Sequence, residues 1–561
     1  MTMEKRPRRQ QRSGFVLNNR TLLILVGVLS AVLVVLLVIS GSLVNNATTD
    51  PADNTLNSEQ STGASSSSTQ SSSVASQPSS SIVTQPSSSI TTQTQSSITT
   101  QPPTSAPKPP VTPSGGNYIN VGTGYIAEVV QANVETFDGK TTDDYSHVTN
   151  NYLPEGTVDY CDSELKYNGK TAYVLLRSGH RTYLEKKVYP FDQEPITRAI
   201  AEVKRYNGTL PDHNEIGFAS LETVGRHSIL TLNSLWKAPF YFETNQSGYA
   251  NPKGGKDRSY AVTSNNISYV DITFCYTTAL TGKVTIPANH PLFKSAEVIK
   301  NESDYTLRLH LRKAGGFYGW HAYYNDNDQL CFKFLNPAKA TAADNKYGAD
   351  LTGVTVMIDV GHGGTDGGAE AFLCEKCKLV WAKKNQLLDK KNCTSCKQEV
   401  QLHYEEADLN LSLANALKAE LESVGATVIM NRSVDKSINI NDRLSDLMDT
   451  APDICIAVHQ NSYSTSSVSG FDSYYFTPWS RMAASNIATY TKETGIYTKS
   501  RFAWSVNYFM MRQTVCPVVL TENGYESNFD DLTAMIDPVK VEGKATAIAH
   551  GVADYFLAIN K

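Results

Sequence analysis

From residue 351 to the C-terminus, short apolar runs alternate with stretches of helical periodicity, and this alternation limits the fold more than any other feature of the sequence. Strands are expected at 354–360, 426–430, 454–459, 471–476 and 515–520. Helices are expected at 408–424, 442–449, 481–494, 502–513 and 541–559. Alternating strands and helices form a mostly parallel sheet with helices on both faces. The predicted fold class of residues 351–561 is therefore α/β, with reactive groups gathered at the carboxyl ends of the strands.

Three of the expected strands end in residues that can bind a metal or transfer protons. They are Asp-Val-Gly-His-Gly-Gly at 359–364, His-Gln-Asn at 459–461 and Thr-Glu-Asn-Gly at 521–524. A zinc hydrolase needs nitrogen or oxygen ligands from three side chains and one open position for water. His362 and His459 supply two ligands, so an acid or a third histidine has to complete the set.

The third ligand lies among His403, Glu405 and Glu406, at the start of an expected helix. Helical spacing aligns Glu406 with the leucines of the apolar face at 413–421. Glu405 aligns with a more polar face, so Glu406 is expected to point toward the strand ends. His403 lies one turn earlier and remains an alternative ligand.

The order of these residues resembles a known family. The motifs are Asp359-x-Gly-His362-Gly-Gly, Glu406-x-Asp408-Leu409-Asn410-Leu411, Asn431-Arg432-x-x-Asp435, Asp442-Arg443, His459-x-Asn461 and Glu522-x-Gly524-Tyr525-x-Ser527-Asn528. Over residues 351–560 the chain resembles the zinc-dependent N-acetylmuramoyl-L-alanine amidases of the amidase_3 family. The resemblance implies that His362, Glu406 and His459 bind a catalytic zinc ion and that Glu522 is the catalytic carboxylate. It also implies cleavage of the amide between N-acetylmuramic acid and the L-alanine of the stem peptide in peptidoglycan.

The chemistry of zinc fits these residues independently of the family. Zinc lowers the pKa of bound water toward about 7 and polarises the scissile carbonyl. Glu522 would take the water proton and pass it to the leaving amine. Asp359 is a candidate for orienting a zinc-bound histidine, whereas Asn461 and Arg443 are expected to shape the site or contact substrate.

The connection between His362 and Glu406 is longer than this chemistry needs and contains two Cys-x-x-Cys pairs. Its four cysteines are Cys374, Cys377, Cys393 and Cys396. Two such pairs about fifteen residues apart are typical of a four-cysteine zinc ribbon, so a second, structural zinc ion is expected in an insertion at about 371–398. Two disulfides are the alternative for a protein outside the cell.

The N-terminus predicts a membrane anchor. Residues 1–21 carry six basic residues and one acid, and 22–44 follow without a charge. About 20 apolar residues span a bilayer, and basic flanks stay in the cytoplasm. A cleaved signal peptide is the alternative, but the apolar run is longer than such peptides need. We expect a cytoplasmic tail at 1–21, a single transmembrane helix at 22–44 and the remainder outside, at the cell wall.

Two further regions separate the anchor from the α/β domain. Residues 45–117 are dominated by Ser, Thr, Gln and Pro, which predicts a disordered linker. Residues 118–344 are rich in strand-forming residues and turn signals, with a hairpin expected around Asn168-Gly169 and one helix at about 194–206. One or two β-rich modules are expected there, with a wall-binding, regulatory or spacer role.

The sequence therefore favours a peptidoglycan hydrolase. Its expected partners are peptidoglycan and the membrane, while the net charge of -5 indicates no nucleic-acid partner. One alternative is a wall-binding scaffold with an inactive or autoinhibited domain. Another is a zinc peptidase that acts on stem peptides. Identification of the ends released from peptidoglycan separates these three functions.

Overall fold

The computed structural model describes most of the chain after residue 117. The described residues are 118–130, 134–138, 151–167, 170–183, 203–246, 264–382, 392–393, 395–400, 402–497, 499, 503–506 and 508–560. The predicted tail, membrane helix and linker at 1–117 lie outside them. Within the described part, no helix is both long enough and apolar enough to cross a bilayer.

The first folded part is a seven-stranded sheet with the strand order β3-β2-β6-β5-β4-β1-β7. Its strands are β1 (Tyr118–Val129), β2 (Val134–Asp138), β3 (Asn151–Leu153), β4 (Val158–Tyr167), β5 (Lys170–Leu176), β6 (His180–Tyr183) and β7 (Val203–Arg205). The predicted hairpin is confirmed, since Tyr167 pairs with Lys170 where antiparallel β4 and β5 meet. The predicted helix at 194–206 is wrong at its C-terminal end, where β7 pairs with β1 and buries Val203. The earlier residues of that helix lie outside the described part.

The second folded part contains two more sheets, with the orders β10-β11-β14-β13 and β12-β8-β9-β16-β15. Its strands are β8 (Asn214–Val224), β9 (His227–Ser234), β10 (Phe240–Thr244), β11 (Tyr269–Phe274), β12 (Thr277–Thr281), β13 (Phe293–Lys300), β14 (Tyr305–Leu311), β15 (Trp320–Tyr324) and β16 (Leu330–Leu335). Alternate side chains of both sheets enter one core that is rich in phenylalanine. A short ladder of β17 (Thr341–Ala342) and β18 (Ala349–Asp350) follows.

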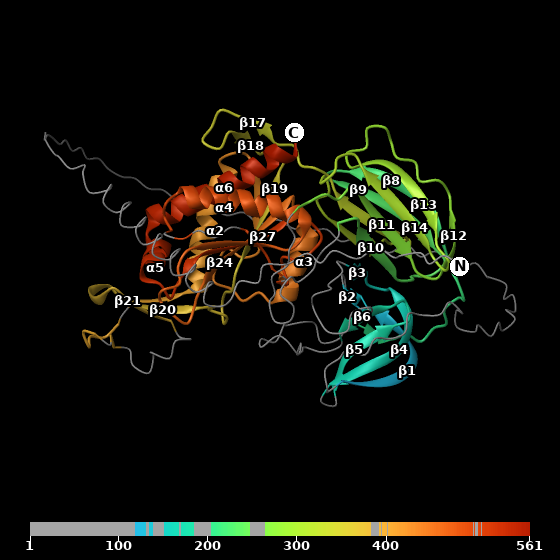
Figure 1. Cartoon of the computed structure of the whole chain (residues 1–561), viewed down its shortest axis with the longest axis horizontal. Helices are drawn as coiled ribbons and strands as arrows, with labels where there is room; N and C mark the ends of the chain where they lie inside the picture. The colour runs from blue at the N-terminus through green and yellow to red at the C-terminus, as the bar shows by residue number, and fades with distance from the viewer. Residues whose placement is uncertain are drawn as a thin grey trace, which may run out of the picture. The chain divides into compact units, whose positions relative to one another are not determined.

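The third folded part is built on a six-stranded sheet with the order β23-β19-β24-β27-β25-β26 (Figure 1). Its strands are β19 (Thr355–Val360), β23 (Thr427–Met430), β24 (Ile454–Asn461), β25 (Phe471–Tyr475), β26 (Trp504–Ser505) and β27 (Val518–Tyr525). Every pairing is parallel except that of β25 with β27. The predicted mostly parallel α/β architecture is thus present.

Three of the five helices of this part begin at a residue whose side chain caps them. The helices are α2 (Glu406–Glu422), α3 (Ile440–Thr450), α4 (Arg481–Glu493), α5 (Phe529–Ile536) and α6 (Pro538–Ile559), with short 3-10 turns η2 (Glu375–Cys377) and η4 (Pro478–Ser480). Asn439 caps α3, Asn528 caps α5, and Asp537 caps α6 through side-chain oxygens that accept backbone N–H groups. The predicted helix at 502–513 is wrong: the described residues there form β26 and turns.

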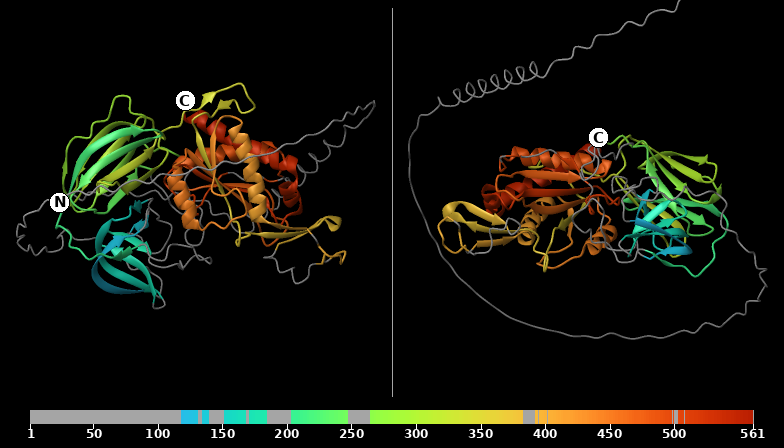
Figure 2. Two further views of the ribbon diagram at one scale, coloured as in Figure 1. Left: turned by 180° about the vertical axis from the view of Figure 1, so that it is seen from behind. Right: turned by 60° about the horizontal axis from the view of Figure 1, so that its bottom comes forward.

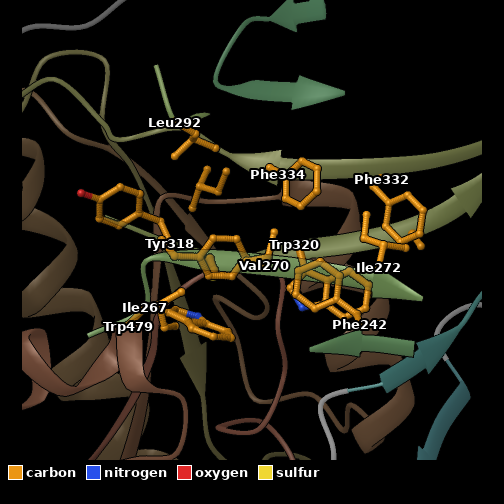
Figure 3. Close-up of a cluster of buried hydrophobic side chains, with 14 of the residues drawn as sticks. Phe242, Ile267, Val270, Ile272, Leu292, Tyr318, Trp320, Phe332, Phe334 and Trp479 are labelled. Carbon is orange, nitrogen blue, oxygen red and sulfur yellow. The ribbon is translucent and has the colours of Figure 1, made fainter. Parts of the chain in front are cut away.

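The two faces of the six-stranded sheet are covered in different ways. Val356 and Ile358 belong to a core shared with α2, α4 and α6, and these helices lie over the sheet in Figure 2. Met357, between them in the strand, points to the opposite face and belongs to a core shared with α3 and the second β-rich part. Figure 3 shows this shared core, with Trp479 of η4 close to aromatic side chains of the β-rich part. The β-rich part therefore covers a face that helices were expected to cover.

The cysteine-containing insertion forms a small sheet of its own, β21-β20-β22. Its strands are β20 (Glu370–Cys374), β21 (Leu379–Ala382) and β22 (Leu402–Glu405). β20 pairs antiparallel with both neighbours and, with β21, extends away from the six-stranded sheet (Figure 1). At the base of the insertion, Ala371 and Leu373 pack against Leu532 and Met535 of α5 in the third folded part. β22 runs directly into α2, so the insertion is joined to the residue that begins that helix.

Candidate metal and catalytic site

Three adjacent parallel strands bring the reactive residues together. β24 lies between β19 and β27, with Val360 opposite Val458 and His459 opposite Glu522. The carboxyl ends of these strands therefore meet at one edge of the sheet, which is where ligands bind in open α/β sheets.

His362, Glu406 and His459 converge on one point. Each offers a ligand atom, and the three atoms lie within 4.8 Å of one another. The Glu406 carboxylate lies between the rings, with Oε2 3.1 Å from His362 Nε2 and Oε1 3.0 Å from His459 Nδ1. Two imidazoles and a carboxylate are the donor set of many catalytic zinc sites. The residues present therefore fit a divalent metal ion with a position left open.

The charges in this cluster depend on one another. Burial alone would lower the pKa of His362, but hydrogen bonds and charge from Glu406, and then Asp366, raise it to about 9. Burial would raise the pKa of Glu406, but the two histidines hold it well below its usual range. Glu406 is therefore ionised, which is the form in which a carboxylate binds a metal ion.

The sequence predicts that Glu406, and not Glu405, points toward the strand ends, and the structure agrees. Glu406 is only 5% exposed and begins α2, whereas Glu405 is its N-cap residue and is half-buried. His403 lies on β22, where its ring stacks on Phe372 and its Nε2 is 3.4 Å from Glu370. His403 is therefore not part of the group formed by the other two histidines.

Glycines allow the backbone to approach the ligand side chains. A Cβ at Gly361 would lie 2.3 Å from the His459 ring, and one at Gly368 would lie 2.6 Å from Glu406 Oε2. His362 itself has a φ of 57°, a left-handed conformation that costs energy for a residue other than glycine. Any residue larger than glycine at 361 or 368 would displace a ligand.

Two buried arginines hold the loop that carries His362. Arg443 donates to the carbonyls of Val360 and His362 at 2.7 and 2.9 Å. Arg432 donates to the carbonyls of Gly361 and Ala407 at 2.8 and 2.7 Å and so ties this loop to α2. The expectation that Arg443 shapes the site fits this placement.

The orienting carboxylate of His362 is Asp366 and not Asp359. Asp359 Oδ1 accepts hydrogen bonds from Arg443 and Asn431. It lies next to Ile358 on β19, so its side chain points to the opposite face, and among the described residues no hydrogen bond or ion pair joins it to a histidine. Asp366 Oδ2 is instead 2.9 Å from His362 Nδ1, which leaves Nε2 directed at Glu406. A carboxylate on the second ring nitrogen fixes the tautomer and orientation of a metal-binding histidine.

Glu522 lies beside the group of three and is not one of its members. On β27 it is opposite His459 of β24 and Asp472 of β25. Its Oε2 is buried and has no hydrogen-bond partner among the described residues. Burial raises the pKa of Glu522 well above its usual range, and the charges of Glu406, Asp472 and Glu526 raise it further. A carboxylate with a raised pKa holds a proton more tightly than an exposed glutamate does.

Glu526 is a second buried acid near the site that sequence reasoning did not single out. It is fully buried, and neither carboxylate oxygen has a hydrogen-bond partner among the described residues. Burial raises its pKa well above the usual range, followed by the charges of Glu406 and Glu370. Its backbone N–H donates to the carbonyl of Asn461 at 2.7 Å, which is how the predicted residue Asn461 joins β24 to the loop after β27.

The four cysteines of the insertion also come together. Ligand atoms of Cys374, Cys377, Cys393 and Cys396 lie within 4.8 Å of one another. All four are free thiols, and Cys393 is buried while the other three are half-buried. The insertion therefore holds a second group of donors, chemically unlike the first.

Comparison with known proteins agrees with the motif order. Residues 356–554 match the Amidase_3 family, described as N-acetylmuramoyl-L-alanine amidase. A Staphylococcus aureus protein named "Probable cell wall amidase LytH" is 30% identical over 217 residues, which make up 38% of this chain and 63% of that protein. The family resemblance expected from the sequence is thus confirmed for this domain.

Solved structures also match this part of the chain. The catalytic domain of CwlV, an N-acetylmuramoyl-L-alanine amidase from Bacillus (Paenibacillus) polymyxa var. colistinus, is 24% identical, covers 37% of this chain and 99% of that chain, and gives a TM-score of 0.30. An N-acetylmuramoyl-L-alanine amidase from Clostridium difficile 630 is 22% identical, with coverage of 36% and 96% and a TM-score of 0.29.

Proposed function

We propose that this chain, whose residues 356–554 form an amidase_3 domain, is a zinc-dependent peptidoglycan hydrolase anchored in the membrane. Its reaction is hydrolysis of the amide between N-acetylmuramic acid and the L-alanine of the stem peptide. The observation that carries the proposal is the convergence of His362, Glu406 and His459 within 4.8 Å, with Glu522 on the adjoining strand.

Zinc would be held by His362 Nε2, His459 Nδ1 and the Glu406 carboxylate, the atoms that face one another in the structure. When bound, it would supply a Lewis acid that polarises the amide carbonyl and makes water more acidic. The open position of a three-ligand site admits water and substrate.

The side chain that moves protons is Glu522. Its raised pKa makes the carboxylate a stronger base than an exposed glutamate. It takes one proton from the attacking water as the oxygen forms a bond to the carbonyl carbon. It then gives that proton to the alanine nitrogen as the carbon–nitrogen bond breaks, so a free amine leaves.

Other residues keep the ligands in place. Asp366 holds the His362 ring through Nδ1, and Arg443 and Arg432 hold the backbone that carries this histidine. The backbone N–H of Ala369 donates to Glu406 Oε2 at 3.0 Å, and that of Gln460 donates to Oε1 at 3.2 Å. A pre-set carboxylate loses less entropy when it binds an ion.

The location of the enzyme follows from its N-terminus. The basic residues at 1–21 and the uncharged run at 22–44 support a single membrane helix with the N-terminus in the cytoplasm. A linker at 45–117 would then allow the folded parts to reach nearby wall. Protease added to intact protoplasts should digest the folded parts and leave the tail; protection of the whole chain would refute this topology.

The experiment that tests the activity is digestion of purified peptidoglycan by the detergent-solubilised full chain. Amidase activity releases stem peptides with a new N-terminal L-alanine and leaves glycan strands without peptide. Cuts between amino acids of the stem peptide would show a peptidase instead. Sedimentation with peptidoglycan without release of any end would show a scaffold. The Glu522→Gln variant is the matched control for chemistry contributed by a contaminating hydrolase.

A further inference from the structure

The two Cys-x-x-Cys pairs form turns of the same design. The first knuckle, residues 374–378, closes the hairpin between β20 and β21, where Cys374 pairs with Leu379. The second knuckle, residues 393–397, lies inside an antiparallel bridge between Asn392 and Glu399. Each pair therefore occupies the tip of a tight β-turn, although the two turns are far apart in sequence.

The described backbone of the two knuckles shares two features. The residue after the second cysteine, Lys378 or Lys397, is left-handed, with φ of 52° and 60°. In each knuckle the first cysteine accepts a hydrogen bond from the backbone N–H of the second; the distance is 3.5 Å from Cys396 N to Cys393 Sγ. N–H groups aimed at sulfur stabilise the thiolate form, which is the form that binds metal.

The four sulfurs meet at one point between the knuckles. Their ligand atoms all lie within 4.8 Å of one another, and Cys374 Sγ is 3.8 Å from Cys396 Sγ. Four thiolates arranged tetrahedrally at about 2.3 Å from zinc are separated by about 3.8 Å. We propose that Cys374, Cys377, Cys393 and Cys396 bind a structural zinc ion that closes the outer end of the insertion.

The outer end of the insertion needs such a link because few apolar side chains are buried among its described residues. None of the residues of η2 is buried, and the apolar cluster of the insertion lies at its base, around Ala371 and Leu373. A small unit without a hydrophobic core depends on a metal or on disulfides for its shape. Two disulfides would require two separate pairs, whereas the sulfurs here share a single centre. The exposed lysines 376, 378 and 397 offset the excess negative charge of four thiolates around one zinc.

The ion would also steady the strand that leads to Glu406. β20 and β22 pair along their length, from Leu373 with Leu402 to Glu370 with Glu405. At the base of this ladder Glu406 N donates to Ala369 O at 2.9 Å, and Ala369 N donates back to the Glu406 carboxylate. Closing the far end of the ladder therefore limits the motion of the backbone that positions this carboxylate.

The first test is the zinc content of the detergent-solubilised full chain and of four variants, measured by mass spectrometry of the metal. The wild-type chain should contain two zinc ions per chain. Cys374→Ser and Cys393→Ser should each contain one, and so should His459→Ala. Cys331→Ala, which removes a free cysteine of β16, should still contain two. A value of one in the wild type that Cys374→Ser leaves unchanged would overturn the proposal.

A second measurement does not depend on the folding of the cysteine variants. His459→Ala loaded with cobalt should show the intense thiolate-to-cobalt absorption of a tetrahedral four-sulfur site, because its four cysteines are intact. Absence of that band would overturn the structural site, whether or not the enzyme cleaves peptidoglycan. After denaturation with chelator and without reductant, all nine cysteines should react as thiols. Protection of four of them as disulfides would equally overturn it.

Discussion

Two groups of potential metal ligands, connected by the short ladder of β20 and β22, differ in almost every chemical property. The group at the base contains two imidazoles and a carboxylate, next to buried acids that lack hydrogen-bond partners within the described part of the chain. The group at the tip consists of four thiols. Three nitrogen and oxygen donors leave a coordination position open, whereas four thiolates fill a tetrahedron. The difference indicates that the base of the insertion adjoins the reactive site, whereas its tip has a structural role.

The largest expected effect is the response to a chelator. A mild chelator should remove the metal at the His362 group first, because nitrogen and oxygen donors with an open position release zinc more readily than four thiolates. Turnover should fall to background when one zinc has left, and added zinc or cobalt should restore it. Measurement of released zinc against activity checks this. If activity disappeared only with the second ion, the two groups would not differ as proposed.

Glu522→Gln should lower kcat by about 10³-fold, because it removes the base while keeping the shape of the side chain. Zinc content should stay at the wild-type value, since Glu522 lies outside the ligand group. Release of N-terminal L-alanine from peptidoglycan measures the rate. Asp530→Asn, which removes an exposed acid at the start of α5, is the control and should behave like wild type. Near-normal turnover by Glu522→Gln would remove the basis for its assigned role.

Asp366→Asn should lower activity by about tenfold, through weaker zinc binding and a less well-oriented His362. The Asp366 side chain is 68% exposed, so solvent screens part of its charge. The effect should appear mainly in the zinc concentration that gives half-maximal activity and should be overcome by excess zinc. A loss that excess zinc does not relieve would mean that Asp366 acts on substrate and not on the histidine.

The smallest effect is expected at the tip. Lys378→Gly should stabilise the first knuckle by about 1 kcal/mol, because glycine adopts the left-handed conformation without the steric cost that lysine carries. Lys376→Gly, two residues earlier in η2, should destabilise the knuckle, because Lys376 is not left-handed and glycine only adds flexibility there. Hydrogen exchange of the backbone amides of β20 and β21 measures both, while activity should change little. Equal destabilisation by the two substitutions would argue against a strained knuckle.

Much of the site could be predicted because it depends on regular structure. The histidines follow apolar strands, and parallel strands place their carboxyl ends at one edge. The helical face of α2 selected Glu406 over Glu405, and the burial of Glu406 agrees with that choice. Both predictions depend only on the spacing of apolar residues, which differs between helices and strands.

Asp366 could not be predicted because its position depends on a loop without periodicity. The loop turns at His362 and Gly364, both left-handed, and is held by hydrogen bonds from Gly364 and Thr365 to Asp435 and Ser437. Those partners lie about seventy residues further along the chain. No local sequence pattern indicates such contacts, and the acid that precedes the motif, Asp359, is the one that the sequence favours.

The helix predicted at 502–513 is wrong for a similar reason, because distant contacts determine the backbone there. Its apolar residues have helical spacing, but they are buried against different neighbours. Arg512 O accepts a hydrogen bond from Tyr152 OH at 2.9 Å, and Thr514 O accepts one from Trp320 N at 2.7 Å. Contacts with both β-rich parts fix this backbone in turns, so tertiary packing overrides local propensity.

The match to the amidase family begins at residue 356. The hydrophobic core that contains this region extends to residues before that position. Met357, Val518 and Leu520 share a single interior with Phe317 and Trp320. A fragment limited to residues 356–554 would expose this apolar surface to water and would tend to aggregate. The second β-rich part therefore supplies one wall of the core beneath β19 and β27, and substitutions in its interior should disturb the strands that carry the candidate site residues.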